Sequence, residues 1–139
     1  MSLERTFSIV KPDAVAAGHA GTILAMIEAA GFKILALRMT RLSEAQARGF
    51  YAVHREKPFF AGLVKFMTEG PIIVMALERD NAIAALREVM GATNPAKAAE
   101  GTIRKRFATS IERNCIHGSD APETAATELG FFFSAAELL

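Results

Sequence analysis

One short segment carries the residue types that could perform covalent chemistry. Residues 114–120 read Asn-Cys-Ile-His-Gly-Ser-Asp, and His117 stands just before a predicted helix N-terminus. Free backbone N–H groups and the positive dipole end of a helix favour an anion and disfavour an imidazolium ion. A neutral ring nitrogen of His117 would be a nucleophile, and Gly118 lets a bulky group approach it. The alternative is that Ser119 and Asp120 only cap the helix.

The other two histidines lack such surroundings. His19 follows Gly18 in a predicted loop, and His54 follows a predicted helix. We expect both to face solvent without a functional role. The glycine-rich motif of dinucleotide-binding folds and the Walker A loop are both absent from the sequence, so the common phosphate-cradling loops do not apply.

Hydrophobic periodicity indicates the elements that would position these residues. Short β-prone or apolar runs predict strands at residues 6–10, 32–39, 72–77 and 114–116. Amphipathic spacing predicts helices at residues 22–30, 43–53 and 59–67, a fourth capped by Asp80 or Asn81 and ended by Gly91, and a last one from Asp120. Ser43 and Gln46 have the spacing of a capping box at the start of the second helix.

The order of these elements predicts a single α+β domain over residues 1–139. Helices that connect strands of a small sheet favour a ferredoxin-like βαββαβ fold, a four-stranded antiparallel sheet with added helices. A small Rossmann-type sheet is the alternative. Residues 91–113 form a long connection with at most two short helical pieces. A loop of that length is more often functional than idle.

Composition excludes several function classes. The chain has 139 residues, of which 51% are hydrophobic, and its formal net charge is +1. This balance argues against disorder and against a dedicated nucleic-acid binder. A single cysteine cannot form an internal disulfide, and the longest apolar run, residues 72–77, is too short to cross a membrane. We therefore expect a cytoplasmic protein with no membrane partner.

Several short motifs, in order along the chain, match one family. They are Glu4-Arg-Thr-Phe7, Lys11-Pro-Asp13, Gly49-Phe-Tyr51, Pro58-Phe-Phe60, Gly70-Pro71, Gly91-Ala-Thr-Asn-Pro95, Gly101-Thr-Ile-Arg104 and the block at residues 114–120. With these motifs the chain resembles nucleoside diphosphate kinases over nearly its whole length. The resemblance implies transfer of the γ-phosphoryl of a nucleoside triphosphate to a nucleoside diphosphate, by a ping-pong mechanism with little base specificity.

The resemblance also implies roles for individual residues. It puts the phosphohistidine on His117, a hydrogen bond to its imidazole on Glu128, and a ring against the imidazole on Tyr51. Lys11 would lie near the transferred phosphoryl. The implied nucleotide contacts are Arg87, Arg104 and Thr93 for the phosphates, Lys11 and Asn114 for the ribose, and Phe59 and Leu63 for the base. Stacking on an aromatic ring tolerates any base, which suits low specificity.

The cofactor and partners follow from the same resemblance. Mg²⁺ would arrive with the nucleotide and bridge its phosphates, with Asp120 reaching it through water and no permanent metal cage. The partners would be ATP, other nucleoside tri- and diphosphates, and further copies of the chain in a tetramer or hexamer. The phenylalanines at residues 131–133 would pack on the body or on another subunit.

Two departures from the family pattern leave other hypotheses open. Residues 104–106 read Arg-Lys-Arg, with two basic residues where the family usually has a small residue and an acid. This cluster could alter nucleotide affinity or a subunit contact, and it keeps open a nucleic-acid-binding role, which the near-neutral charge disfavours as the main one. Cys115 replaces a small aliphatic residue and is expected to be buried packing. A third hypothesis, a ligand-binding regulator without catalysis, is disfavoured by the intact set of site residues.

Overall fold

The architecture rests on a four-stranded antiparallel sheet. The computed structural model describes residues 3–138, with strands β1 (Leu3–Val10), β2 (Lys33–Thr40), β3 (Ile72–Asp80) and β4 (Ile116–Gly118). Their order is β2-β3-β1-β4, and every neighbouring pair is antiparallel. This is the ferredoxin-like arrangement predicted from the sequence. The Rossmann-type alternative is wrong, because its strands would run parallel.

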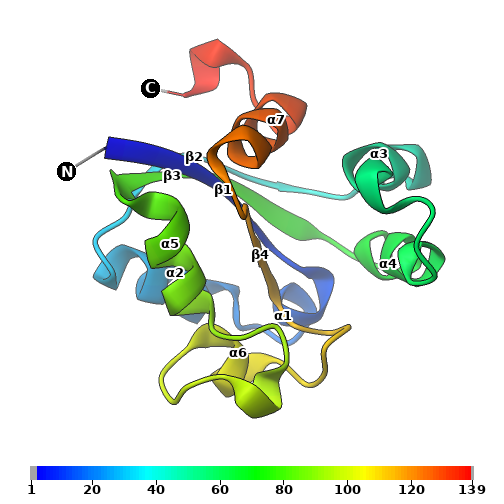
Figure 1. Cartoon of the computed structure of the whole chain (residues 1–139), viewed down its shortest axis with the longest axis horizontal. Coiled ribbons are helices and arrows are strands. Elements are labelled where there is room, and N and C mark those ends of the chain that lie inside the picture. The colour runs from blue at the N-terminus through cyan, green and yellow to red at the C-terminus, as the bar shows by residue number, and fades with distance from the viewer. Residues whose placement is uncertain (1–2, 139) are drawn as a thin grey trace.

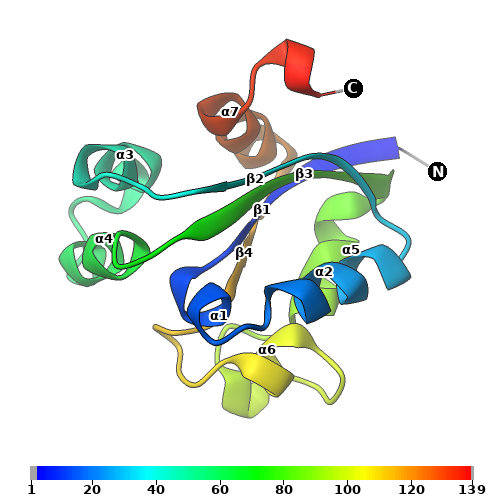
Figure 2. The same ribbon diagram turned by 180° about the vertical axis from the view of Figure 1, so that it is seen from behind.

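Helices fill the connections between the strands. They are α1 (Pro12–Ala16), α2 (Ala20–Ala29), α3 (Glu44–Phe50), α4 (Phe60–Met67), α5 (Ala82–Met90), α6 (Ile103–Phe107) and α7 (Pro122–Phe132), with 3-10 turns η1 (Ala52–His54), η2 (Pro95–Lys97) and η3 (Ala135–Glu137). Helices α2 and α5 lie on one side of the sheet, whereas α7 lies on the other, and α3 and α4 form a hairpin at one end (Figures 1 and 2). The connection at residues 91–113 holds η2 and α6, the two short helical pieces expected there.

Strand β3 shows how the sheet divides the core. Ile72, Val74 and Ala76 pack with residues of α3, α4 and α7. Ile73, Met75 and Leu77 alternate with them and pack with residues of α2 and α5. Successive side chains of a strand point to opposite faces, so a strand with helices on both sides is apolar at every position. The prediction of a buried strand at residues 72–77 is confirmed.

The last strand lies two residues later than predicted. Cys115 has φ of 60°, in the left-handed region, so the backbone turns there and β4 begins at Ile116. The register pairs His117 with Ile9 and Gly118 with Ser8. His117 is therefore part of the sheet, on an edge strand that pairs with β1.

Two helix boundaries show local and non-local capping. The capping box at Ser43 and Gln46 is confirmed, with both reciprocal hydrogen bonds present, although α3 ends at Phe50 rather than near residue 53. Asn81 occupies the N-cap of α5, one of the two predicted positions, but its side chain makes no capping hydrogen bond. Instead the Ile83 backbone N–H donates to the Glu4 carboxylate of β1 at 2.8 Å.

Candidate active site

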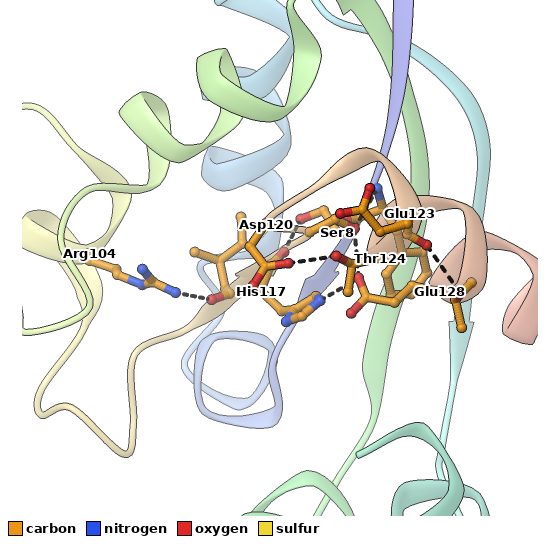
Figure 3. A network of polar contacts seen from close by, with 11 residues as sticks. Ser8, Arg104, His117, Asp120, Glu123, Thr124 and Glu128 are labelled. Atoms are coloured by element: carbon orange, nitrogen blue, oxygen red, sulfur yellow. Dashed lines mark hydrogen bonds and ion pairs between the residues drawn. The ribbon is translucent and has the colours of Figure 1, made fainter. Parts of the chain in front are cut away.

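A hydrogen-bonded corner fixes the imidazole of His117. Its Nε2 lies 2.9 Å from Oε1 of Glu128, which projects from α7 (Figure 3). A carboxylate only accepts, so Nε2 carries the ring proton and Nδ1 keeps a free lone pair. The Ser119 hydroxyl donates to the same Glu128 oxygen at 2.6 Å, and the Ser8 hydroxyl donates to the His117 carbonyl at 2.7 Å. The sequence predicted neither contact: Ser8 reaches His117 through the pairing of β1 with β4, and Ser119 reaches Glu128 through the packing of α7.

Aromatic rings pack beside the same imidazole. The ring centroid of Phe50 lies 5.7 Å from that of His117 at 74°, and that of Phe7 lies 6.0 Å away. Tyr51 lines the same cleft, but its buried hydroxyl has no hydrogen-bond partner among residues 3–138. Burial, and secondly the charge of Glu128, raises the pKa of Tyr51 well above its usual value. Phe50, for which the sequence predicted no role, thus has the shorter of the two ring distances to His117.

The imidazole lines a cleft with a volume of about 260 Å³. The cleft is lined by Lys11, Phe50, Tyr51, Val53, His54, Phe59, Leu63, Arg87, His117, Gly118, Asp120, Thr124 and Glu128. Phe59 stands at its edge with 52% of its surface exposed, an unusual state for a large apolar side chain. The cleft therefore combines the expected nucleophile, two cations and a free aromatic face.

Neither of the remaining histidines is simply solvent-facing, as the sequence suggested. His54 is partly buried in the cleft wall, its ring 5.4 Å from that of Phe59, and its Nδ1 has no partner within the described residues. His19 is also partly buried and stacks on Phe107 at 4.3 Å, outside the cleft. The contact of His19 with Phe107 joins segments distant in sequence, which local patterns do not reveal, whereas His54 and Phe59 are near neighbours in the chain.

Lys11 is buried where β1 ends. Its Nζ donates to the Asn114 side-chain oxygen at 2.8 Å, and the Asn114 amide donates to the Ile111 carbonyl at 2.9 Å. Burial, followed by the charge of Arg104, lowers the pKa of Lys11 to about 8. An ammonium group so poorly solvated gains much from an anion placed beside it.

A second hollow adjoins the cleft and shares Arg87 with it. Arg87, Thr93 and Arg104 line this hollow, so the structure separates Thr93 and Arg104 from the imidazole and uses Arg87 as the bridge. Arg87 and Thr93 are exposed, and the guanidinium of Arg87 donates no hydrogen bond within residues 3–138. Their donor groups are therefore free for a ligand.

Arg104 differs, because backbone carbonyls already occupy much of its guanidinium. It donates to the carbonyls of Ile116, Gly91 and Asn114 at 2.7, 3.0 and 3.3 Å. Burial lowers the pKa of Arg104 to about 10. In Figure 3 it approaches β4 from the side opposite Glu128. Arg104 thus ties both ends of the 91–113 connection to the strand that carries His117.

The carboxylates available to a metal ion are few. Asp120 is exposed and accepts a hydrogen bond from the Thr124 hydroxyl at 2.6 Å, which is the main cause of its lowered pKa. No group of three or more metal-ligating side chains occurs in the part of the chain that the structure describes. The other carboxylate that lines the cleft, Glu128, is already bonded to His117 and Ser119.

The departures noted in the sequence have distinct environments. Within residues 104–106 only Arg104 is buried, whereas Lys105 and Arg106 are exposed. Cys115 is fully buried, and burial raises the pKa of its thiol to about 12, as expected for a packing residue.

Within residues 3–138 no helix is long and apolar enough to span a membrane.

A ferredoxin-like sheet with a carboxylate-bound histidine in a cationic cleft is typical of a phosphotransferase. The model of the family described as nucleoside diphosphate kinase matches residues 4–138. Nucleoside diphosphate kinases of Methylobacterium sp. (strain 4-46) and Nitratidesulfovibrio vulgaris (strain DP4) are 60% and 59% identical, covering 100% and 99% of this chain and 99% of each relative.

Solved structures agree with this match. The Aquifex aeolicus nucleoside diphosphate kinase superposes with a TM-score of 0.97 at 45% identity, covering 99% of this chain and 100% of that one. The Halobacterium salinarum enzyme, solved in complex with CDP, gives 0.94 at 41% identity, covering 99% and 92%. The chain belongs to the nucleoside diphosphate kinase family. It is an enzyme that binds nucleotides and transfers the γ-phosphoryl of a nucleoside triphosphate to a nucleoside diphosphate.

Proposed function

We propose that His117 carries the phosphoryl group between the two nucleotides. Nδ1 attacks the γ-phosphorus, the bond from that phosphorus to the bridging oxygen breaks, and the nucleoside diphosphate leaves. In the second half-reaction a terminal phosphate oxygen of another nucleoside diphosphate attacks, and the Nδ1–P bond breaks. The observation that supports this assignment is the bond from Nε2 to Glu128, which leaves Nδ1 unprotonated in a cleft shared with Lys11 and Arg87.

The charged groups divide the stabilisation of the phosphates. Lys11 would neutralise charge at the transferred phosphoryl, and Arg87 would contact phosphates from both the cleft and the adjoining hollow. Thr93 would donate its hydroxyl in the hollow. Arg104 keeps N–H groups beyond its three carbonyl bonds, so it would contact phosphate while still holding β4. Glu128 would stabilise the positive charge that the imidazole acquires during attack.

The sugar and base would lie along the apolar part of the cleft. Phe59 would stack on the base, with Leu63 beside it, because the Phe59 side chain lines the cleft and about half of its surface is exposed. Asn114 would contact the ribose together with Lys11, to which it is already bonded. Tyr51 would limit the space beside the imidazole. Low base specificity follows from a slot that offers stacking and few polar readers.

Mg²⁺ would enter as part of the nucleotide. The ion neutralises phosphate charge when bound, and Asp120 would contact its water shell from the cleft edge. Glu128 is engaged by His117 and Ser119 and is therefore not available to the ion.

The chain would act as a cytoplasmic homo-oligomer, a tetramer or hexamer. The strand β2 is an edge of the sheet, and its Leu37 and Met39 are exposed. An unpaired edge with apolar side chains is suited to contact with another copy. A single cysteine, fully buried, is consistent with a reducing compartment.

One experiment tests the central assignment. The protein is incubated with ATP and Mg²⁺, and its intact mass is measured under neutral conditions. We expect a gain of one phosphoryl group, labile to acid, that is lost in His117→Ala and kept in His19→Ala, whose histidine lies outside the cleft. Removal of a covalent nucleophile is expected to lower kcat by about 10⁴-fold or more. An unchanged mass gain in His117→Ala would overturn the assignment.

A further inference from the structure

A single hydrogen bond does not fix the direction in which Nδ1 of His117 points. Histidine χ2 is a broad sp³–sp² torsion, and rotation about it swings Nδ1 while Nε2, near the far end of the ring, moves less. The bond to Glu128 therefore defines the tautomer better than it defines the ring plane. A second support must act on the sides of the ring, where no hydrogen bond can form.

Phe50 supplies contact at that place. It stands nearly perpendicular to the imidazole and is part of the same cleft wall. Edge-to-face aromatic pairs have a preferred angle and resist rotation of either ring. Phe7 contacts the imidazole as well, but it is a core residue of β1 and its ring is fully buried.

The C-terminal end of α7 holds Phe50 in turn. Phe131 and Phe132 have ring centroids 5.5 and 5.3 Å from that of Phe50. The Phe132 carbonyl accepts a 2.6 Å hydrogen bond from Arg38 of β2, which fixes this end of the helix. Phe131 remains 43% exposed, so its ring packs against Phe50 at the surface and is not part of the buried core.

We propose that Phe50 is a positioning residue that sets the ring plane of His117, and that Phe131 supports it from the C-terminal end of α7. This inference rests on the proposed role of His117. Glu128 then selects the nitrogen that stays unprotonated, and Phe50 aims it. A small misdirection of a nucleophile lowers the rate of attack with little effect on binding, because binding uses other groups.

Phe50→Leu tests the proposal against Phe66→Leu. Phe66 is buried in the same core cluster, but it makes no ring contact with His117 among the described residues. We expect Phe50→Leu to slow single-turnover phosphorylation by ATP about tenfold while KM for ATP changes less than about twofold. Phe66→Leu should lower Tm by a similar amount and leave both constants within about twofold of wild type. Equal rates in the two variants would overturn the proposal.

Two further variants keep the test decisive. Phe50→Tyr retains the ring and should restore most of the rate. Phe131→Leu leaves Phe50 in place, lies outside the cleft, and should slow phosphorylation about threefold. If Phe50→Leu fails to fold, the phosphorylation rate of Phe131→Leu still tests the proposal. Wild-type rate in Phe131→Leu would remove the support role of the C-terminal end.

Imidazole spectroscopy separates this inference from the proposed function. Two-bond ¹H–¹⁵N spectra of His117 need no nucleotide, and Phe50→Leu should broaden or shift the Nδ1 and Nε2 signals while Phe66→Leu does not. If wild type shows no phosphoryl gain, the role of His117 fails but the spectra still show whether Phe50 holds the ring. Unchanged spectra in Phe50→Leu, together with a normal mass gain in wild type, would contradict only the positioning role.

Discussion

The two sides of the cleft are built differently. On the β4–α7 side, His117, Glu128 and Ser119 are bonded to one another before any ligand binds. On the α5 side, Arg87 and, in the adjoining hollow, Thr93 are exposed, and the guanidinium of Arg87 has no hydrogen-bond partner within residues 3–138. The reacting group is thus oriented in advance, whereas these ligand-binding groups are left for the nucleotide to satisfy.

This difference follows from what each side must do. Reorienting a nucleophile during the reaction raises the barrier, so preorganisation there increases the rate. A phosphate-binding guanidinium gains most when its donors are not already used. Arg104 lies between the two cases, because it holds backbone carbonyls and still borders the hollow. Substitutions on the two sides should therefore have different signatures.

After removal of the nucleophile itself, the largest effect is expected from Glu128→Gln. The amide oxygen still accepts from Nε2, but the charge that stabilises the developing imidazolium is lost, and kcat should fall about 100-fold. Single-turnover phosphorylation by ATP measures this. Glu123→Gln, an exposed change on the same helix, is the control and should keep the wild-type rate. A loss below about threefold in Glu128→Gln would show that the corner is not preorganised by charge.

The two arginines offer the sharpest contrast in stability. Arg87→Ala should lower kcat/KM roughly 30-fold, since a charge-assisted phosphate contact is worth about 1.5–3 kcal/mol, while the free energy of unfolding changes by less than about 0.5 kcal/mol. Arg104→Ala should lower the free energy of unfolding by about 2–4 kcal/mol, because three backbone carbonyls lose their donor. Urea titration of both variants decides this, and equal stability losses would contradict the distinction.

A smaller effect is expected from a substitution of Phe59, the proposed stacking surface for the base. Phe59→Ala removes the stacking surface, so KM should rise about tenfold for purine and pyrimidine nucleotides alike. The ring is half exposed, so Tm should change little. Phe60→Ala, the buried neighbour, is the matched control and should lower Tm strongly. A KM change confined to one class of base would show that Phe59 reads the base instead of merely stacking on it.

Local signals in the sequence predicted local structure well. The capping box at Ser43 and the apolar run at residues 72–77 depend on neighbours a few residues away, and both are confirmed. The cap of α5 by Glu4 joins residues 79 positions apart, so no local pattern contains it. The shift of β4 depends on the backbone turn at Cys115, a residue type that gives no warning of positive φ.

The same division applies to the candidate site. Resemblance to a family identified residues that would touch the nucleotide, because such residues form recognisable motifs. It predicted no role for Ser119 or Phe50, although both lie within the matched motifs, because Ser119 is bonded to Glu128 of α7 and Phe50 reaches His117 only through tertiary packing. The spacing of residue types gives no measure of such contacts, since they depend on the tertiary structure.

The smallest effect is expected from the ionisation of Lys11, which a pH profile of kcat/KM measures. Its pKa is about 8 in the folded protein, below the usual 10.5, so the unfolded chain binds more protons between these values. The free energy of unfolding therefore gains from this group as pH rises from about 8 to 10.5, whereas the positive charge in the cleft is lost. Since kcat/KM reports ionisation of the free enzyme, it should decline above pH 8, approaching tenfold per pH unit.

Lys11→Met should abolish that alkaline decline and give a lower, flatter profile. Lys33→Met, at an exposed position on β2, is the matched control and should reproduce the wild-type profile. The pKa of Arg104, about 10, lies above that of Lys11, about 8, so the first part of the decline reports the ionisation of Lys11. If the decline persists in Lys11→Met, another group causes it. The role of Lys11 would then be structural, as a buried donor to Asn114.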